Sequence, residues 1–325
     1  MSVQVSVVIP TYRRPELIAR CLAAVLAQRL EPAAFEVIVV DDGHDEATRA
    51  AVSALAPASG APALVYLRPA HGRGPAVARN TGWRAARAPL VAFTDDDTLP
   101  ERDWLAEGLA ALRDPTLAAV CGRVRVPDAT DPPTDHELMT RGLESAEFVT
   151  ANAFVRRAAL ERVGGFDERF RRAWREDSDL QFRLQHEVGA VGRAPRATVL
   201  HPVRRERWGV SLAQQRNAFF DALLYKKHPR LYRERIRRVP PWDYYAIVAA
   251  TLAGPVLFAL GRPVPGAAAL ALAGALVLAF AARRLRRTSR APAHVAEMLV
   301  TSALIPFLAV YWRLRGAWRF RTLFL

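Results

Sequence analysis

The first hundred residues alternate short apolar runs with amphipathic stretches, and this alternation constrains the fold more than any other feature. Four runs rich in β-branched or other apolar residues predict buried strands, at 3–9, 35–40, 63–67 and 90–94. The stretches between them repeat apolar residues at helical spacing and predict helices at 15–28, 45–55 and 75–86. Strands that alternate with helices form mostly parallel sheets covered on both faces. The sequence therefore predicts an α/β fold with a mostly parallel sheet and helices on both faces.

Farther along the chain the same signals continue with less regularity. Strands are expected at 117–126 and 197–201, and helices at 100–112, 176–187 and 211–228.

Polar residues gather where the four predicted strands end. They are one tyrosine, two arginines and five aspartates, namely Tyr12, Arg73, Arg79, Asp41, Asp42 and Asp95–Asp97. In open α/β sheets, ligands bind at the carboxyl ends of the strands. We therefore expect these side chains to converge on one ligand site.

The three consecutive aspartates at 95–97 directly follow an apolar run. Carboxylates held side by side repel one another, and a divalent cation would relieve that repulsion. Mg²⁺ and Mn²⁺ prefer oxygen ligands and often share their sites with substrate phosphates. A solvated acidic turn, or the N-cap of the next helix, would explain the triplet as well. The triplet alone leaves both interpretations open.

The C-terminal part differs from the rest in charge and hydropathy. Residues 1–200 hold 25 basic and 27 acidic residues, whereas residues 201–325 hold 21 and 5. The basic excess therefore lies beside three apolar runs, at 244–260, 266–282 and 295–310. Basic residues that flank apolar segments are typical of proteins held against anionic lipid. We expect a hairpin of two membrane spans, a third run that either spans or lies in the interface, and no nucleic-acid partner.

Six segments resemble the motifs of family-2 glycosyltransferases with the GT-A fold, and they follow that family's order over residues 3–230. The segments are VSVVIPTYRRP at 5–15, VIVVDDG at 37–43, GRGPAVARNTG at 72–82, FTDDD at 93–97, GGFDE at 164–168 and REDSDL at 175–180. The resemblance implies a Rossmann-like GT-A catalytic domain over 1–238, and membrane-associated helices would then occupy 239–325. The basic, apolar C-terminus resembles membrane-attached bacterial members.

The resemblance also implies an activity. Family members transfer a sugar from a nucleotide donor (UDP-, GDP- or dTDP-linked here), with inversion at the anomeric carbon and usually with Mg²⁺ or Mn²⁺. Pro10 and Tyr12 would lie near the base, and Asp41 or Asp42 would read its edge. Arg73 and Arg79 match positions near the diphosphate, although Arg79 fits a structural role better.

The acidic triplet matches the family's metal-binding motif in two frames. Either Asp95 and Asp97 or Asp95 and Asp96 act as the pair, and we favour Asp97 on the metal with Asp95 or Asp96 towards the ribose. His201 follows a predicted strand and would add a metal or phosphate contact, unless it is an ordinary loop histidine.

Inverting transfer requires one base that takes the proton of the acceptor hydroxyl. Glu176 and Asp177 lie where the family places that base, and Asp177 matches better. They also begin a predicted helix, whose free N–H groups would keep Asp177 ionised.

These features predict a membrane-attached, metal-dependent enzyme that transfers a single sugar. Processive synthases carry a Gln-x-x-Arg-Trp motif, and the corresponding residues here, 214–217, read QQRN. The catalytic domain should face the cytoplasm, where nucleotide sugars are made. The acceptor would be a hydroxyl or phosphate of a lipid-linked saccharide, a polyprenyl phosphate or another cell-envelope glycan. The alternative is a catalytically silent relative that binds nucleotide sugar or serves as a membrane scaffold.

Overall fold

The computed structural model describes residues 2–57, 62–127 and 130–324. The chain packs into two compact units. The first comprises Met1–Pro127 and Arg141–Pro202, and the second comprises Asp128–Thr140 and Val203–Leu325. These units are defined by packing alone, so a functional boundary near Arg238 stays a prediction.

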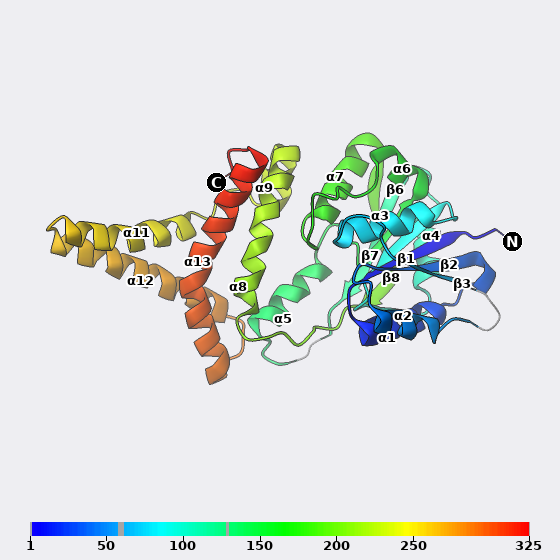
Figure 1. The fold of residues 1–325 in the computed structure, drawn as a ribbon, viewed down its shortest axis with the longest axis horizontal. Coiled ribbons are helices and arrows are strands. Elements are labelled where there is room, and N and C mark those ends of the chain that lie inside the picture. Colours follow the sequence, from blue (N-terminus) through cyan, green and yellow to red (C-terminus); the bar gives the residue numbers. More distant parts are fainter. Residues whose placement is uncertain (1, 58–61, 128–129, 325) are drawn as a thin grey trace. The chain divides into compact units, whose positions relative to one another are not determined.

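A mixed sheet forms the centre of the first unit (Figure 1). Within the described residues its strand order is β3-β2-β1-β4-β7-β6-β8-β5. The strands are β1 Val5–Thr11, β2 Phe35–Asp41, β3 Ala63–Leu67, β4 Leu90–Thr94, β5 Leu99–Pro100, β6 Leu117–Arg125, β7 Asn152–Arg156 and β8 Ala190–Leu200.

The four strands predicted from the alternation are parallel to one another, as β1 pairs with β2 and β4, and β2 pairs with β3. The second half of the sheet is different, because β7 lies antiparallel between β4 and β6. The sheet is therefore mixed, and its parallel part is the half that carries most of the predicted site.

Helices cover both faces of this sheet, as expected. The longer ones are α1 Pro15–Leu26, α2 Glu46–Ser53, α3 Pro75–Ala85, α4 Trp104–Ala111, α6 Arg157–Val163 and α7 Glu176–Glu187. Figure 1 shows α1 and α2 on one side and α3 on the other. This follows from right-handed crossovers, because the chain moves outward from β1 to β3 and then returns to β4 on the far side of β1.

Two predicted boundaries are wrong. The strand predicted at 197–201 begins earlier, at Ala190, because its first residues pair with β6. Residues 99 and 100 form the short strand β5, so α4 begins at Trp104 and not at Pro100. The partner of β5 is the end of β8, where Leu200 pairs with Leu99 in antiparallel register. The pairing of two distant segments therefore overrides the local helical pattern.

The close packing of α4 on the sheet yields a first prediction. A Cβ atom added at Gly108 would lie 2.2 Å from the ring of the buried Phe154. We expect Gly108→Ala to destabilise the protein by about 1–3 kcal/mol, because overpacking forces the ring to move. Urea unfolding measures this loss. Gly142→Ala is the control, since a Cβ there meets nothing within 4 Å. Equal stability of the two variants would contradict the prediction.

The second unit is entirely helical within its described residues. It contains α5 Asp135–Thr140, α8 Val210–Gln214, α9 Ala218–Lys227, α10 Pro229–Leu231, a π-helical turn at Tyr232–Ile236, α11 Trp242–Ala259, α12 Pro263–Leu285 and α13 Pro292–Phe320. The single helix predicted at 211–228 is instead divided into α8, a 3₁₀ turn and α9. Among the described residues, α11, α12 and α13 are long and apolar enough to cross a membrane. They contain the three predicted apolar runs.

Candidate active site

The candidate site lies at the carboxyl ends of β1 and β4, where the order of the strands along the sheet changes direction. Strands β1 and β4 are neighbours, and their connections lead away to opposite sides. Such a switch point is the usual ligand site of open α/β sheets. Tyr12 directly follows β1 and is 47% exposed, while Pro10 lies within β1. The acidic triplet directly follows β4.

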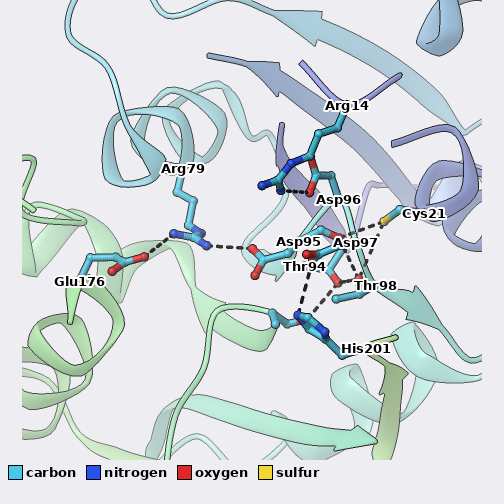
Figure 2. A network of polar contacts seen from close by, with 11 residues as sticks. Arg14, Cys21, Arg79, Thr94, Asp95, Asp96, Asp97, Thr98, Glu176 and His201 are labelled. Carbon is cyan, nitrogen blue, oxygen red and sulfur yellow. Dashed lines mark hydrogen bonds and ion pairs between the residues drawn. The ribbon is translucent and has the colours of Figure 1, made fainter. Parts of the chain in front are cut away.

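A tight turn at 95–98 carries the acidic triplet. The Thr98 amide and hydroxyl both donate to the Asp95 carbonyl oxygen, at 3.2 and 2.9 Å. The Thr98 and Thr94 hydroxyl oxygens lie 2.6 Å apart, and both residues are buried. This rigid turn directs the three carboxylates to three different partners (Figure 2).

Asp95 belongs to a chain of ion pairs centred on Arg79. The Arg79 guanidinium donates to Asp95 at 2.8 Å and to Glu176 at 2.9 Å, and Figure 2 shows it between the two acids. Only 3% of the Arg79 side chain is exposed. Arg79 thus compensates two acids from different parts of the chain, and its predicted role at a diphosphate stays a prediction.

Asp96 points into the protein. Its carboxylate accepts hydrogen bonds from the Thr11 hydroxyl at 2.8 Å and from the Arg14 guanidinium at 3.0 Å. Burial raises the pKa of Asp96 to about 6, and the neighbouring aspartates add to this while Arg14 opposes it. This position favours a structural role, and a ribose contact by Asp96 stays a prediction.

Asp97 faces His201. The Asp97 Oδ1 and His201 Nε2 atoms are 3.5 Å apart, and both side chains are largely buried. The pairing of β5 with β8 causes this proximity, because it holds the residue after Leu200 beside the acidic turn. The His201 Nδ1 is buried and has no hydrogen-bond partner among the described residues.

The donor set of Asp97 and His201 fits a divalent cation. A carboxylate oxygen and an imidazole nitrogen suit Mn²⁺, with the remaining ligands supplied by water and phosphate. No group of three or more His, Cys, Asp or Glu side chains that could hold a metal occurs in the part of the chain that the structure describes. If a cation binds here, Asp97 and His201 would be its protein ligands, since Arg79 engages Asp95.

The neighbouring aspartates 41 and 42 differ in their partners. Asp41 is fully buried and accepts from the Gly43 and Asp45 amides and from the Tyr66 hydroxyl. Asp42 accepts only from the Gly74 amide at 2.8 Å, and its Oδ1 has no partner among the described residues. Asp41 thus fixes the loop, whereas the buried Oδ1 of Asp42 has an unused capacity to accept a hydrogen bond.

Arg73 lies in the loop before α3, between Gly72 and Gly74. Both glycines have positive φ angles, +77° and +110°, which favour glycine. The Arg73 side chain is exposed and available to an anion.

Glu176 and Asp177 form the first turn of α7. Glu176 is buried against Arg79, whereas Asp177 is half-buried and accepts the Ser178 amide at 2.7 Å. Burial raises the pKa of both carboxyls, that of Glu176 to about 7. Desolvation therefore outweighs the N–H groups at the start of α7 in setting the direction of this shift, and the ionised state of Asp177 stays a prediction. A carboxylate with a raised pKa is a stronger base.

Sequence reasoning missed the partners that orient the acids, above all Arg14 and Tyr66. Arg14 lies in the same segment as Tyr12, and the need of a buried carboxylate for a cation could have pointed to it.

A known family model matches the part of the chain that carries most of these motifs. The model of the family described as Glycosyl transferase family 2 matches residues 6–175, which is slightly more than half of the chain. The chain belongs to glycosyl transferase family 2.

Two bacterial proteins are among the relatives of this family-2 chain. It is 35% identical over 150 residues to the pre-mycofactocin glycosyltransferase of Mycobacterium tuberculosis, covering 42% of this chain and 32% of that protein. It is 30% identical over 276 residues to the validoxylamine A glucosyltransferase of Streptomyces hygroscopicus subsp. limoneus, covering 70% of this chain and 58% of that protein. The family-2 chain thus spans less than two thirds of the length of these relatives.

One solved structure resembles the whole fold. It is the mannosyltransferase PcManGT from Pyrobaculum calidifontis, described in complex with GDP-Man and Mn²⁺. The TM-score is 0.60 at 22% identity, over 98% of this chain and 88% of that one. This likeness supports the GT-A fold of the family-2 chain.

Proposed function

We propose that this family-2 glycosyltransferase transfers a single sugar from a nucleotide donor to an acceptor hydroxyl or phosphate, with inversion, at the cytoplasmic membrane surface. The observation that carries the proposal is the turn at 95–98, which directs Asp97 towards His201 at the ligand-binding edge of the sheet.

Three side chains would hold the nucleotide part of the donor. The exposed Tyr12 ring stacks on the base, and the unpaired Asp42 Oδ1 accepts an N–H group from its edge. Arg73 contacts the diphosphate, because it is exposed in the loop whose Gly74 amide contacts Asp42.

Asp97 and His201 would hold a divalent cation, Mn²⁺ or Mg²⁺, together with oxygens of the diphosphate. When bound, such an ion offsets the negative charge on the departing nucleoside diphosphate. The similar mannosyltransferase from P. calidifontis is described with Mn²⁺, which supports a divalent cation in the reaction.

Asp177 would be the base of the reaction. Its carboxylate takes the proton from the acceptor hydroxyl while the acceptor oxygen bonds to the anomeric carbon. The bond from that carbon to the diphosphate oxygen breaks on the opposite side, and its electron pair leaves with the nucleoside diphosphate. One displacement inverts the configuration.

The acceptor is proposed to be lipid-linked. Three helices in the described chain are long and apolar enough to enter a membrane, and basic residues flank them. An acceptor held at the same surface would meet the enzyme without diffusing through water.

A donor panel tests the function. Released nucleotide is measured with UDP-, GDP- and dTDP-sugars and Mn²⁺, for the full chain in lipid vesicles. We expect one donor class to be consumed. Asp97→Asn and His201→Gln should each lower this rate by on the order of 100-fold, because the cation loses a ligand. Both should also weaken Mn²⁺ binding measured by calorimetry.

Asp103→Asn is the matched control, since Asp103 is an exposed aspartate near the same turn. Unchanged Mn²⁺ binding in Asp97→Asn would contradict the metal assignment. Donor binding without turnover of any donor would instead favour the silent nucleotide-sugar-binding alternative.

A further inference from the structure

Helix α13 has one covered face and one exposed face along its whole length. The buried residues recur every three or four positions, and they are His294, Met298, Thr301, Ser302, Ile305, Pro306, Ala309, Val310, Arg313 and Gly316. The opposite face exposes large apolar side chains, namely Leu299, Val300, Leu304, Tyr311, Leu314 and Trp318. Protein of the second unit therefore covers one side, and an apolar stripe is left open on the other.

The covered face meets charged groups in its N-terminal half. The Arg284 guanidinium donates to the Thr301 hydroxyl at 2.7 Å and to the Ser302 hydroxyl at 3.1 Å. The same guanidinium pairs with Asp135 at 2.7 Å. One turn earlier, Glu297 accepts the Gly209 amide at 2.7 Å. The N-terminal half of α13 thus forms hydrogen bonds with the guanidinium of the Arg284–Asp135 ion pair and with the Gly209 amide.

The C-terminal half meets charged groups as well, because it packs on α9. The contact is close, since a Cβ atom at Gly316 would lie 2.5 Å from the Phe219 carbonyl oxygen. Lys226 donates to the Phe320 carbonyl at 2.7 Å, and Asp221 of α9 is buried. Arg313 is also buried, with its guanidinium 4.1 Å from the Phe324 ring centre.

These contacts leave too little apolar length for a membrane crossing. Only residues 303–312 lie between Ser302 and Arg313, and ten helical residues span about 15 Å. The hydrocarbon core is about 30 Å thick. If α13 crossed it, α9 and the Arg284–Asp135 pair would have to enter the core with it, and charged groups there are costly.

In the other two long helices the charged contacts lie at one end of the hairpin. There Arg283 of α12 pairs with Asp243 of α11, and Arg284 of α12 pairs with Asp135. Helices α11 and α12 have 18 and 23 residues and pack on each other. Their apolar windows are 11% and 22% buried, whereas that of α13 is 44% buried. Outside these charged ends, residues 244–259 of α11 and 263–282 of α12 remain. They span about 24 and 30 Å, which suits a hairpin that enters and leaves a bilayer.

We propose that only the α11–α12 hairpin crosses the membrane, and that α13 lies along the surface of the same leaflet from which the hairpin enters. Its apolar stripe would enter the boundary between headgroups and acyl chains. The exposed Arg315, Arg319 and Arg321 would then contact anionic headgroups, as would the Arg286–Arg287 pair at the hairpin base. This topology rests on the membrane attachment proposed above, and it places the basic C-terminal end on the cytoplasmic side.

Spin-label depth measurements test the orientation of α13. The full chain is reconstituted in phosphatidylcholine–phosphatidylglycerol vesicles, with labels at Leu299→Cys, Leu304→Cys, Leu314→Cys or Trp318→Cys. The native Cys21 and Cys121 are buried, and the unsubstituted protein corrects for them. We expect the four labels to lie at nearly equal depth. A spanning helix would instead change depth by about 28 Å from position 299 to position 318, and that result would overturn the proposal.

Leu270→Cys and Leu278→Cys on α12 provide the internal control. Both side chains are exposed, and a crossing helix should separate them by about 12 Å in depth.

Labelling with a membrane-impermeant maleimide tests the sidedness. We expect Thr322→Cys to react from the same side as Glu187→Cys of the first unit, and Arg262→Cys in the hairpin turn to react only from the other side. Reaction of Thr322→Cys together with Arg262→Cys would overturn the topology. Neither readout requires a sugar donor, so failure here is distinguishable from failure of the proposed transfer reaction.

Discussion

Asp177→Asn should lower sugar transfer by about 10²–10⁴-fold while donor binding stays intact. An asparagine keeps the shape of the side chain and its place in the first turn of α7, but it cannot accept the acceptor's proton. Steady-state transfer rates measure the loss, and titration with the nucleoside diphosphate measures retained binding. Weakened nucleotide binding together with unchanged turnover would contradict the role of Asp177 as base.

The pH dependence follows from the same residue. Burial raises the pKa of Asp177, and a base must be ionised to act. Transfer should therefore fall as the pH is lowered through this raised pKa, and Asp177→Asn should lose that acidic limb. Glu187→Gln, at the exposed C-terminal end of the same helix, is the matched control and should keep both rate and profile.

Arg79→Met should destabilise the first unit by about 3–5 kcal/mol, because it leaves Asp95 and Glu176 without the cation that they share. Denaturant unfolding measures this loss. Arg84→Met on the same helix is the control, since Arg84 and its partner Glu168 are both exposed and such pairs contribute about 0–1 kcal/mol. Equal losses of stability in the two variants would contradict this prediction, because Arg79 would then contribute no more than an exposed arginine.

The loss in Arg79→Met should also depend on pH. The folded-state pKa of Glu176 is already raised to about 7 in the intact protein, so the native state binds more protons than the unfolded state below that pH. Stability from this group therefore falls as the pH rises from the usual glutamate range through 7. Without Arg79 the fall should be steeper, and the variant should recover part of its stability at pH 5.

The sequence could predict the parallel half of the sheet because the signals there are local. Each strand of β1–β4 is a run of apolar residues bounded by polar turns, and a helix pattern separates consecutive strands. Strand β5 has two residues and exists only because Leu200 pairs with Leu99. The antiparallel direction of β7 is likewise set by its pairing with β4 and β6, and no local sequence pattern predicts it.

The residues of the candidate site show the same contrast between local sequence signals and long-range contacts. The sequence pointed to the acidic triplet by a motif and to His201 by its place after a predicted strand, and the structure brings Asp97 and His201 within 3.5 Å of each other. The different directions of the three aspartates depend on the turn closed by Thr98, and a residue pattern does not encode that turn. The raised pKa of Asp177 depends on burial by the whole fold, which the position of the residue at a helix terminus does not reveal.

The discontinuous make-up of the second unit has a practical consequence for anyone who wants a water-soluble version of this enzyme. Residues 130–140 lie between the family-2 motifs at 93–97 and 164–168, yet their partners come from the last third of the chain. Arg284 pairs with Asp135, and the Ser289 amide donates to the Pro133 carbonyl. A stop codon at Arg238 would remove both partners and leave an acidic helix exposed. A water-soluble fragment therefore requires α5 and the new C-terminus to be redesigned together.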